Sequence, residues 1–79
     1  MPEIFRMLGM RFFFYSDEHL PIHVHVRSGD GEAKFEIITG KIILKQSFGL
    51  KSKELKIAEN LIDQNIDLIN EHWLKHFNK

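Results

Sequence analysis

The feature that most constrains the fold is a strict alternation of residue types between positions 22 and 27. Aliphatic and polar residues take turns there: Ile22, Val24 and Val26 alternate with His23, His25 and Arg27. Successive side chains of a β-strand point to opposite faces of its sheet, so a strand would separate these two sets. We therefore predict a strand over 22–27 that buries its aliphatic side chains and leaves both imidazoles on the opposite face.

Other runs before residue 45 also predict strands. The turn sequence Ser28-Gly29-Asp30-Gly31 precedes a second alternating run over 32–37, and this combination is typical of a β-hairpin. Gly9 and Thr39-Gly40 mark two further tight turns. The remaining runs are 2–6, the aromatic stretch 10–15 and 41–45, the last being either a short strand or an apolar connector.

After residue 52 the apolar spacing changes to that of a helix. Steps of three or four positions separate the apolar residues Leu55, Ala58, Ile62, Ile66, Ile69, Trp73 and Phe77. This stripe predicts one amphipathic face over the helical region 52–77. Asn65 marks either a bend or a break into two helices, and the unbroken stripe favours a continuous or gently bent helix.

A stripe of this length can cover the apolar face of a small sheet. We predict a single α+β domain over residues 1–79, an antiparallel β-meander of four to five strands within 2–45 covered by a long C-terminal helix. Trp73 and Phe77 stand at the end of that helix, where it would extend beyond so small a sheet. We expect these two side chains to bind a partner protein or a second copy of the chain.

Composition narrows the functional classes. The chain has 79 residues and no cysteine, which excludes disulfides, thiolate metal sites and a cysteine nucleophile. Its 11 basic and 11 acidic residues balance, which argues against nucleic-acid binding driven by net charge. Lys51, Lys53 and Lys56 form a basic cluster that is typical of a solvated face. The N-terminus lacks the pattern of a secretion signal and no apolar run is long enough to span a membrane, so we expect a cytoplasmic protein without membrane association.

The histidines before residue 27 support three hypotheses. The imidazoles of His23 and His25 on one strand face can converge on a divalent metal ion, and a third ligand could come from His19, Asp17, Glu18 or a facing carboxylate. The three histidines with Arg27 could supply acid–base catalysis in an RNA-directed toxin. Alternatively, the histidines are polar outer residues that fix the neighbouring loop by hydrogen bonds. No motif selects a metal or an enzyme, so we expect no cofactor and, on balance, no catalysis.

Basic and aromatic side chains also gather on the face that carries no helix. This predicted binding surface consists of Arg11, Phe13, Tyr15, His23, His25, Arg27 and Lys34. Aromatic rings beside cationic groups are typical of surfaces that stack single-stranded bases. The alternative is that Phe13 and Tyr15 pack under a loop or the helix end. RNA or DNA therefore stands beside a protein among the expected partners.

Four stretches carry a resemblance to a known family: Met1-Pro2-Glu3-Ile4, the block from Glu18 to Val26, Gly31-Glu32-Ala33, and Trp73. They resemble the bacterial DUF4160 family, a domain of unknown function. The family's pattern has histidines at the positions of His19, His23 and His25, and a second proline where this chain has Ile22. The resemblance implies a small bacterial protein encoded beside another short protein, as in toxin–antitoxin modules, without selecting between toxin, antitoxin and accessory subunit. The function we favour is a small cytoplasmic binding module that pairs with a partner protein or with itself.

Overall fold

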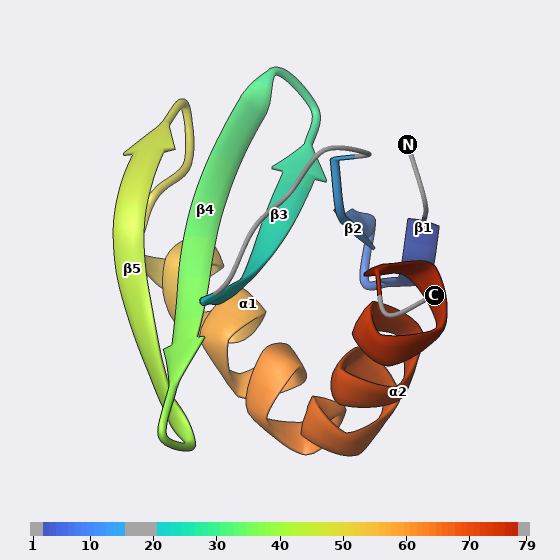
Figure 1. The fold of residues 1–79 in the computed structure, drawn as a ribbon. Coiled ribbons are helices and arrows are strands. Elements are labelled where there is room, and N and C mark those ends of the chain that lie inside the picture. Colours follow the sequence, from blue (N-terminus) through green and yellow to red (C-terminus); the bar gives the residue numbers. More distant parts are fainter. Residues whose placement is uncertain (1–2, 16–20, 78–79) are drawn as a thin grey trace.

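A computed structural model describes residues 3–15 and 21–77, apart from the side chain of Phe77. Five strands come first and two helices follow (Figure 1). The strands are β1 (Glu3–Met7), β2 (Met10–Phe13), β3 (Ile22–Ser28), β4 (Gly31–Ile38) and β5 (Lys41–Phe48). The helices are α1 (Ser52–Gln64) and α2 (Ile66–Phe77). The predicted α+β fold, with the sheet first and the helical region last, is confirmed.

The strands form one antiparallel sheet in which each strand pairs with its neighbours in sequence, in the order β1-β2-β3-β4-β5. Two-residue turns join β1 to β2 and β4 to β5. Both residues of each turn have positive φ, 53° and 78° at Leu8 and Gly9 and 50° and 78° at Thr39 and Gly40. Positive φ at both positions defines the type I′ turn, whose twist matches that of the flanking strands. The tight turns predicted at these positions are confirmed.

The predicted hairpin of β3 and β4 is also confirmed, with pairing from Ile22 opposite Ile37 to Ser28 opposite Gly31. Gly31 begins β4 and is buried against the backbone of Gly49. A Cβ atom at Gly31 would lie 2.5 Å from the carbonyl oxygen of Gly49, so only glycine fits without a backbone shift. This close approach joins the hairpin to the segment that leads from β5 into α1.

Two strands end two or more residues away from their predicted ends. β2 ends at Phe13, two residues before the predicted end at Tyr15. Residues 41–45 are strand rather than connector, and β5 continues to Phe48. The extension pairs Gln46 with Lys34 and Phe48 with Glu32. Such pairing is a contact between strands, so the residue pattern within 41–48 does not reveal it.

The helical region is broken at Asn65, so the favoured continuous helix is wrong and the alternative of two helices is correct. Asn65 has φ −117° and ψ 24°, outside the helical region, and its side-chain amide donates a 2.8 Å hydrogen bond to the carbonyl of Leu61. The apolar stripe continues through the break because the same positions face the sheet in both helices. Neither described helix is long and apolar enough to span a membrane.

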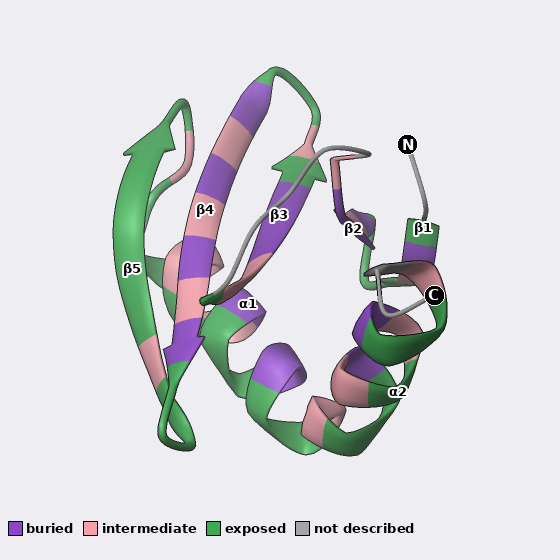
Figure 2. Cartoon of the chain, in the orientation of Figure 1, coloured by how far each residue is buried: buried purple, intermediate pink, exposed green. Residues whose placement is uncertain are grey.

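One core lies between the helices and one face of the sheet. Its fully buried members include Phe12, Phe14, Val24, Val26, Phe35, Ala58, Ile62 and Ile69. α1 contacts β5 and α2 contacts β1, so the two helices together reach across the sheet. In Figure 2 the buried positions follow β3, β4 and the inner turns of the helices, whereas β5 is exposed along nearly its whole length.

Trp73 belongs to this core, with only 5% of its surface exposed. Its indole meets the ring of Phe14 edge-on, with ring centroids 5.1 Å apart. The expected exposed, partner-binding role of Trp73 is therefore wrong: the break at Asn65 folds α2 back onto the sheet instead of letting the helix extend beyond it. The side chain of Phe77, the other residue of that prediction, lies outside the described part of the chain.

Candidate functional site

The face of the sheet opposite the helices, here called the outer face, brings together most of the predicted binding surface. Across β2 and β3, Arg11 lies opposite Arg27 and Phe13 lies opposite His25. Across β3 and β4, His25 lies opposite Lys34. Residues directly opposite each other in an antiparallel sheet share a face, so these five side chains are neighbours.

Phe13 is nevertheless unavailable for base stacking, because it is fully buried. The ring of Tyr15 meets it edge-on at 5.5 Å, the imidazole of His25 stacks on it at 5.7 Å, and the guanidinium of Arg11 lies 5.6 Å from its centroid. The prediction of an exposed Phe13 is therefore wrong, and the alternative of a packed aromatic is correct for this residue. Phe13 supports the outer face from beneath.

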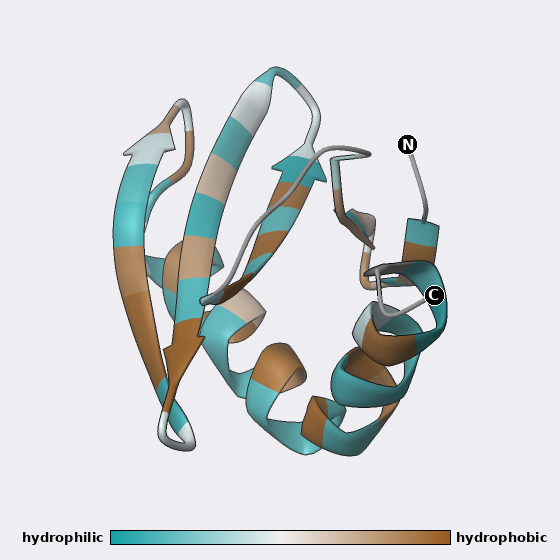
Figure 3. Ribbon diagram, in the orientation of Figure 1, coloured by the Kyte–Doolittle hydropathy of each residue, from teal (hydrophilic) through white to brown (hydrophobic). Residues whose placement is uncertain are grey.

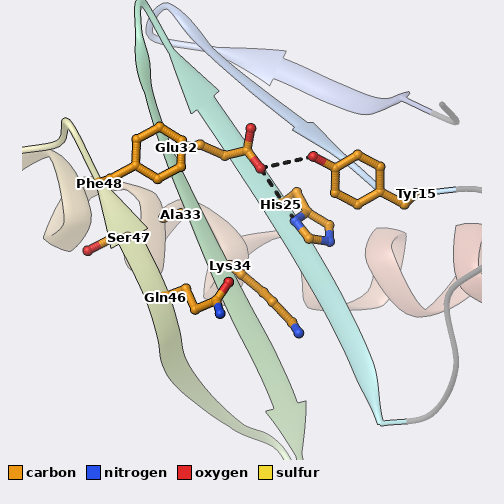
Figure 4. Close-up of a pocket in the computed structure, with 8 residues that line it drawn as sticks. All are labelled: Tyr15, His25, Glu32, Ala33, Lys34, Gln46, Ser47 and Phe48. Carbon is orange, nitrogen blue, oxygen red and sulfur yellow. Dashed lines mark hydrogen bonds and ion pairs between the residues drawn. The ribbon is translucent and has the colours of Figure 1, made fainter.

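The centre of the outer face is the carboxylate of Glu32. Its Oε2 accepts a 3.0 Å hydrogen bond from the hydroxyl of Tyr15, and its Oε1 accepts a 2.7 Å hydrogen bond from Nη2 of Arg27. Nδ1 of His25 lies 3.9 Å from Oε2 (Figure 4). The side chain of Glu32 is only 15% exposed, so three side chains, one from the segment after β2 and two from β3, converge on a largely buried carboxylate.

The surroundings of Glu32 keep its carboxyl group ionised. Burial alone raises the pKa, but the hydrogen bonds from Arg27 and Tyr15, with the positive charge of Arg27, outweigh it and hold the pKa below its usual value. The same hydrogen bond with Glu32 raises the pKa of Arg27. At neutral pH the site therefore presents a carboxylate that accepts hydrogen bonds and donates none.

A cavity of about 220 Å³ opens beside this carboxylate. We call it the Glu32 pocket, and its side chains are Tyr15, His25, Glu32, Lys34, Gln46 and Phe48. In Figure 4 the rings of Tyr15 and Phe48 flank it on opposite sides, with Glu32 at one end and Lys34 and Gln46 at the other. The volume lies below the ~300–1,000 Å³ of pockets for drug-sized ligands, so it suits a single ring system.

The two histidines of β3 have different surroundings. His25 is buried, and its ring meets that of Tyr15 at 4.2 Å. His23 is half-buried, 6.3 Å from the ring of His25 and 6.0 Å from that of Trp73. The expected separation of faces holds for the fully buried Val24 and Val26, but the imidazoles are covered by neighbouring aromatic rings rather than left open.

The metal and catalytic hypotheses remain predictions. Within residues 3–15 and 21–77 no group of three or more histidine, aspartate or glutamate side chains is placed to hold a metal ion. His19, a candidate residue in both hypotheses, lies outside the described residues. Arg27, the fourth member of the catalytic hypothesis, is held in an ion pair with Glu32.

Glu32, Gln46 and Phe48 were not among the site residues predicted from the sequence. Glu32 was predictable from the hairpin: a two-residue turn at Gly29 and Asp30 sets Ser28 opposite Gly31 and therefore Arg27 opposite Glu32. Gln46 and Phe48 had no such signal, because their place beside Glu32 depends on the extension of β5 along β4.

Comparison with known proteins gives the family. A model of DUF4160, a domain of unknown function, matches residues 9–74. The chain belongs to the DUF4160 family. The match includes every residue of the Glu32 pocket and all of β5, so both lie within the DUF4160 domain. Searches of curated proteins and of solved structures found no match.

Proposed function

We propose that this DUF4160 protein is a protein-binding module of the bacterial cytoplasm that works in a toxin–antitoxin-like two-gene system. The partner contributes an extended, acidic segment that adds to the sheet beside β5. The observation that carries the proposal is the exposed apolar edge of β5. The family resemblance, which implies a short protein encoded alongside, supports the two-gene setting.

The edge formed by β5 exposes large apolar side chains. Leu44 is 41% exposed on the face that carries the helices, whereas Phe48 and Ile43 are 64% and 38% exposed on the outer face, and Ile38 is exposed at the adjoining end of β4. Figure 3 colours the middle of β5 as hydrophobic where Figure 2 colours it as exposed. Large apolar side chains exposed along one edge of a sheet are typical of a protein-interaction site.

The backbone of β5 can also receive a further strand. β5 is eight residues long and stands at the edge of the sheet, with β4 as its neighbour on one side. An edge strand presents a row of backbone N–H and C=O groups that an extended segment can pair with, and side-chain pockets then give specificity. A strand added here would become the sixth of the sheet.

A groove beside this edge can take a side chain of the added strand. A cavity of about 460 Å³ lies between β5 and α1 and is lined by Phe35, Leu44 and Leu55, with Lys56 and Glu59 at its polar side. Leu44 therefore lies between the backbone edge and the groove. A single apolar side chain of the partner would therefore both cover Leu44 and fill the groove.

The lysines on and beside β5 favour an acidic partner over a second copy of the chain. Between residues 41 and 56 the chain has five lysines and one acidic residue, Glu54, although its total charge is balanced. Lys41 and Lys45 lie on β5 itself. Pairing two copies of β5 would bring these lysines close together, whereas an acidic segment would complement them. The proposal is therefore a different protein and not a second copy.

The test is complex formation with the product of the neighbouring gene, measured by size-exclusion chromatography with light scattering. We expect a complex with the wild type and loss of the complex with Lys45→Glu. The complex should be unchanged with the matched control Lys75→Glu, which lies at an exposed position of α2. Absence of a complex, a homodimer through β5, or equal binding by both variants would contradict the proposal.

A further inference from the structure

Three arginines and Glu32 form one continuous row across the outer face. The strand register sets Arg6 opposite Arg11, Arg11 opposite Arg27, Arg27 opposite Glu32, and Glu32 opposite Phe48. Each of the five strands therefore contributes one residue to the row. We call Arg6, Arg11 and Arg27 the arginine row, and it leads directly to the Glu32 pocket.

The arginine row lines a second cavity, of about 370 Å³, beside the turns that end β1 and β3. Nε of Arg6 and Nε of Arg11 both donate to Oε1 of Glu3 at 3.0 Å, and Nη2 of Arg27 donates to Glu32. A guanidinium carries five N–H donors, so each arginine in this row has further donors beyond those bonds. Guanidinium groups bind phosphate in a planar, two-point arrangement.

The Glu32 pocket has the chemistry of a nucleobase site. The rings of Tyr15 and Phe48 border it on two sides and are side chains against which a base can stack. The ionised carboxylate of Glu32, at one end, can only accept hydrogen bonds. Each of its oxygens has a second lone pair beyond the one that accepts the hydrogen bond from Tyr15 or Arg27. Lys34 and Gln46 at the other end supply donors.

Guanine is the base that this arrangement selects. Its N1–H and 2-amino groups are adjacent donors that match the two oxygens of one carboxylate, and O6 and N7 are adjacent acceptors that match Lys34 and Gln46. Adenine presents the acceptor N1 on the corresponding edge, which an ionised carboxylate repels. We propose that the outer face binds a guanine nucleotide, with the base in the Glu32 pocket and phosphate on the arginine row.

The test is binding of the four nucleoside 5′-monophosphates by the full chain, measured by isothermal titration calorimetry. Amide chemical shifts in the NMR spectrum locate each binding event. We expect the guanine nucleotide to bind at least about ten-fold more tightly than the adenine nucleotide, with shifts at Lys34, Gln46 and Phe48. Titration with single-stranded RNA and DNA that contain one guanine then distinguishes a free nucleotide from a polymer. We take the natural ligand to be whichever of these binds most tightly.

Three variants separate the parts of the proposal. Glu32→Gln should abolish the preference for guanine, while its control Glu36→Gln, on the same strand and face but outside the pocket, should retain it. Arg11→Gln should weaken all four nucleotides by the same factor. Phe48→Ala, at an exposed position, should weaken guanine binding about ten-fold without unfolding the chain.

Equal binding of the four nucleotides, a guanine preference that survives Glu32→Gln, or chemical-shift changes confined to residues outside the outer face would overturn the inference. Absence of binding by every nucleotide and oligonucleotide at millimolar concentration would do so as well. The proposed partner site on β5 is tested by a different assay, so either proposal can fail without the other.

Discussion

The hydroxyl of Tyr15 donates a 3.0 Å hydrogen bond to Oε2 of Glu32, although the two residues are 17 positions apart in the chain. Tyr15 lies two residues after the end of β2, and Glu32 lies near the start of β4. Their contact passes over β3, where His25 lies 3.9 Å from the same carboxylate oxygen. One hydrogen bond therefore ties the segment that follows β2 to β4 across the candidate site.

Glu32 should make the stability of the fold depend on pH in the acid range. Its pKa is lowered in the folded state, so its contribution to the free energy of unfolding is present above the ordinary value of 4.5 and is lost as pH falls through the folded value. We expect urea denaturation between pH 7 and pH 3 to show a steeper loss of stability for the wild type than for Glu32→Gln.

Some acid sensitivity should remain in Glu32→Gln. The hydrogen bond from Arg6, with a second from Arg11, lowers the pKa of Glu3 in the same direction, although burial opposes it. Tyr15→Phe removes one of the two hydrogen bonds to Glu32, so its pH dependence should lie between those of the wild type and Glu32→Gln. Identical slopes for all three proteins would contradict the role given to Glu32.

Trp73 should be among the residues on which folding most depends. Trp73→Ala removes a buried indole that packs against Phe14 and His23 and leaves a cavity beneath α2. We expect the free energy of unfolding to fall by about 3–5 kcal/mol in chemical denaturation. Leu74→Ala, at an exposed neighbouring position, is the control and should change it by less than about 0.5 kcal/mol. A small effect of Trp73→Ala would restore the idea of an exposed binding residue.

Leu8 stores backbone strain that a substitution can remove. Its φ is 53°, in the left-handed region, and its side chain is 72% exposed at the tip of the β1–β2 turn. Leu8→Asn creates the Asn-Gly pair that type I′ turns prefer, so we expect thermal and urea denaturation to show a gain of about 1 kcal/mol. Leu74→Asn, in a helix, should give no gain. A loss of stability in Leu8→Asn would mean that the leucine side chain makes a contact that matters more than the turn.

The parts of the fold that depend on local pattern were predictable from the sequence. The alternation of β3, the hairpin turn before Gly31 and the glycine turns all follow from side-chain periodicity and from the φ that turn residues adopt. The helical stripe correctly placed Leu55, Ala58, Ile62, Ile66, Ile69 and Trp73 against the core, but it omitted Leu61 and Ile57. It could not reveal the break at Asn65, because a stripe of apolar positions is compatible with a straight or a broken helix.

The candidate site was predictable only in part, since it depends on contacts between strands. His25, Arg27 and Lys34 were correctly grouped, because alternation within β3 and β4 assigns them to one face. Phe13 is covered by Arg11 and Tyr15, two positions away on either side, and by His25 of β3, whereas the place of Phe48 follows from the extension of β5. The contact with His25 and the place of Phe48 depend on pairing between strands, which the residues beside them in the sequence do not reveal.

Hydrogen–deuterium exchange of the chain, alone and with the product of the neighbouring gene, tests the proposed function most directly. If the partner adds a strand beside β5, the backbone amides of residues 41–48 should exchange more slowly in the complex. The amides of β1, at the opposite edge of the sheet, should be unchanged. Slower exchange in β1 or α2 with β5 unaffected would show that the partner binds elsewhere and would contradict the account.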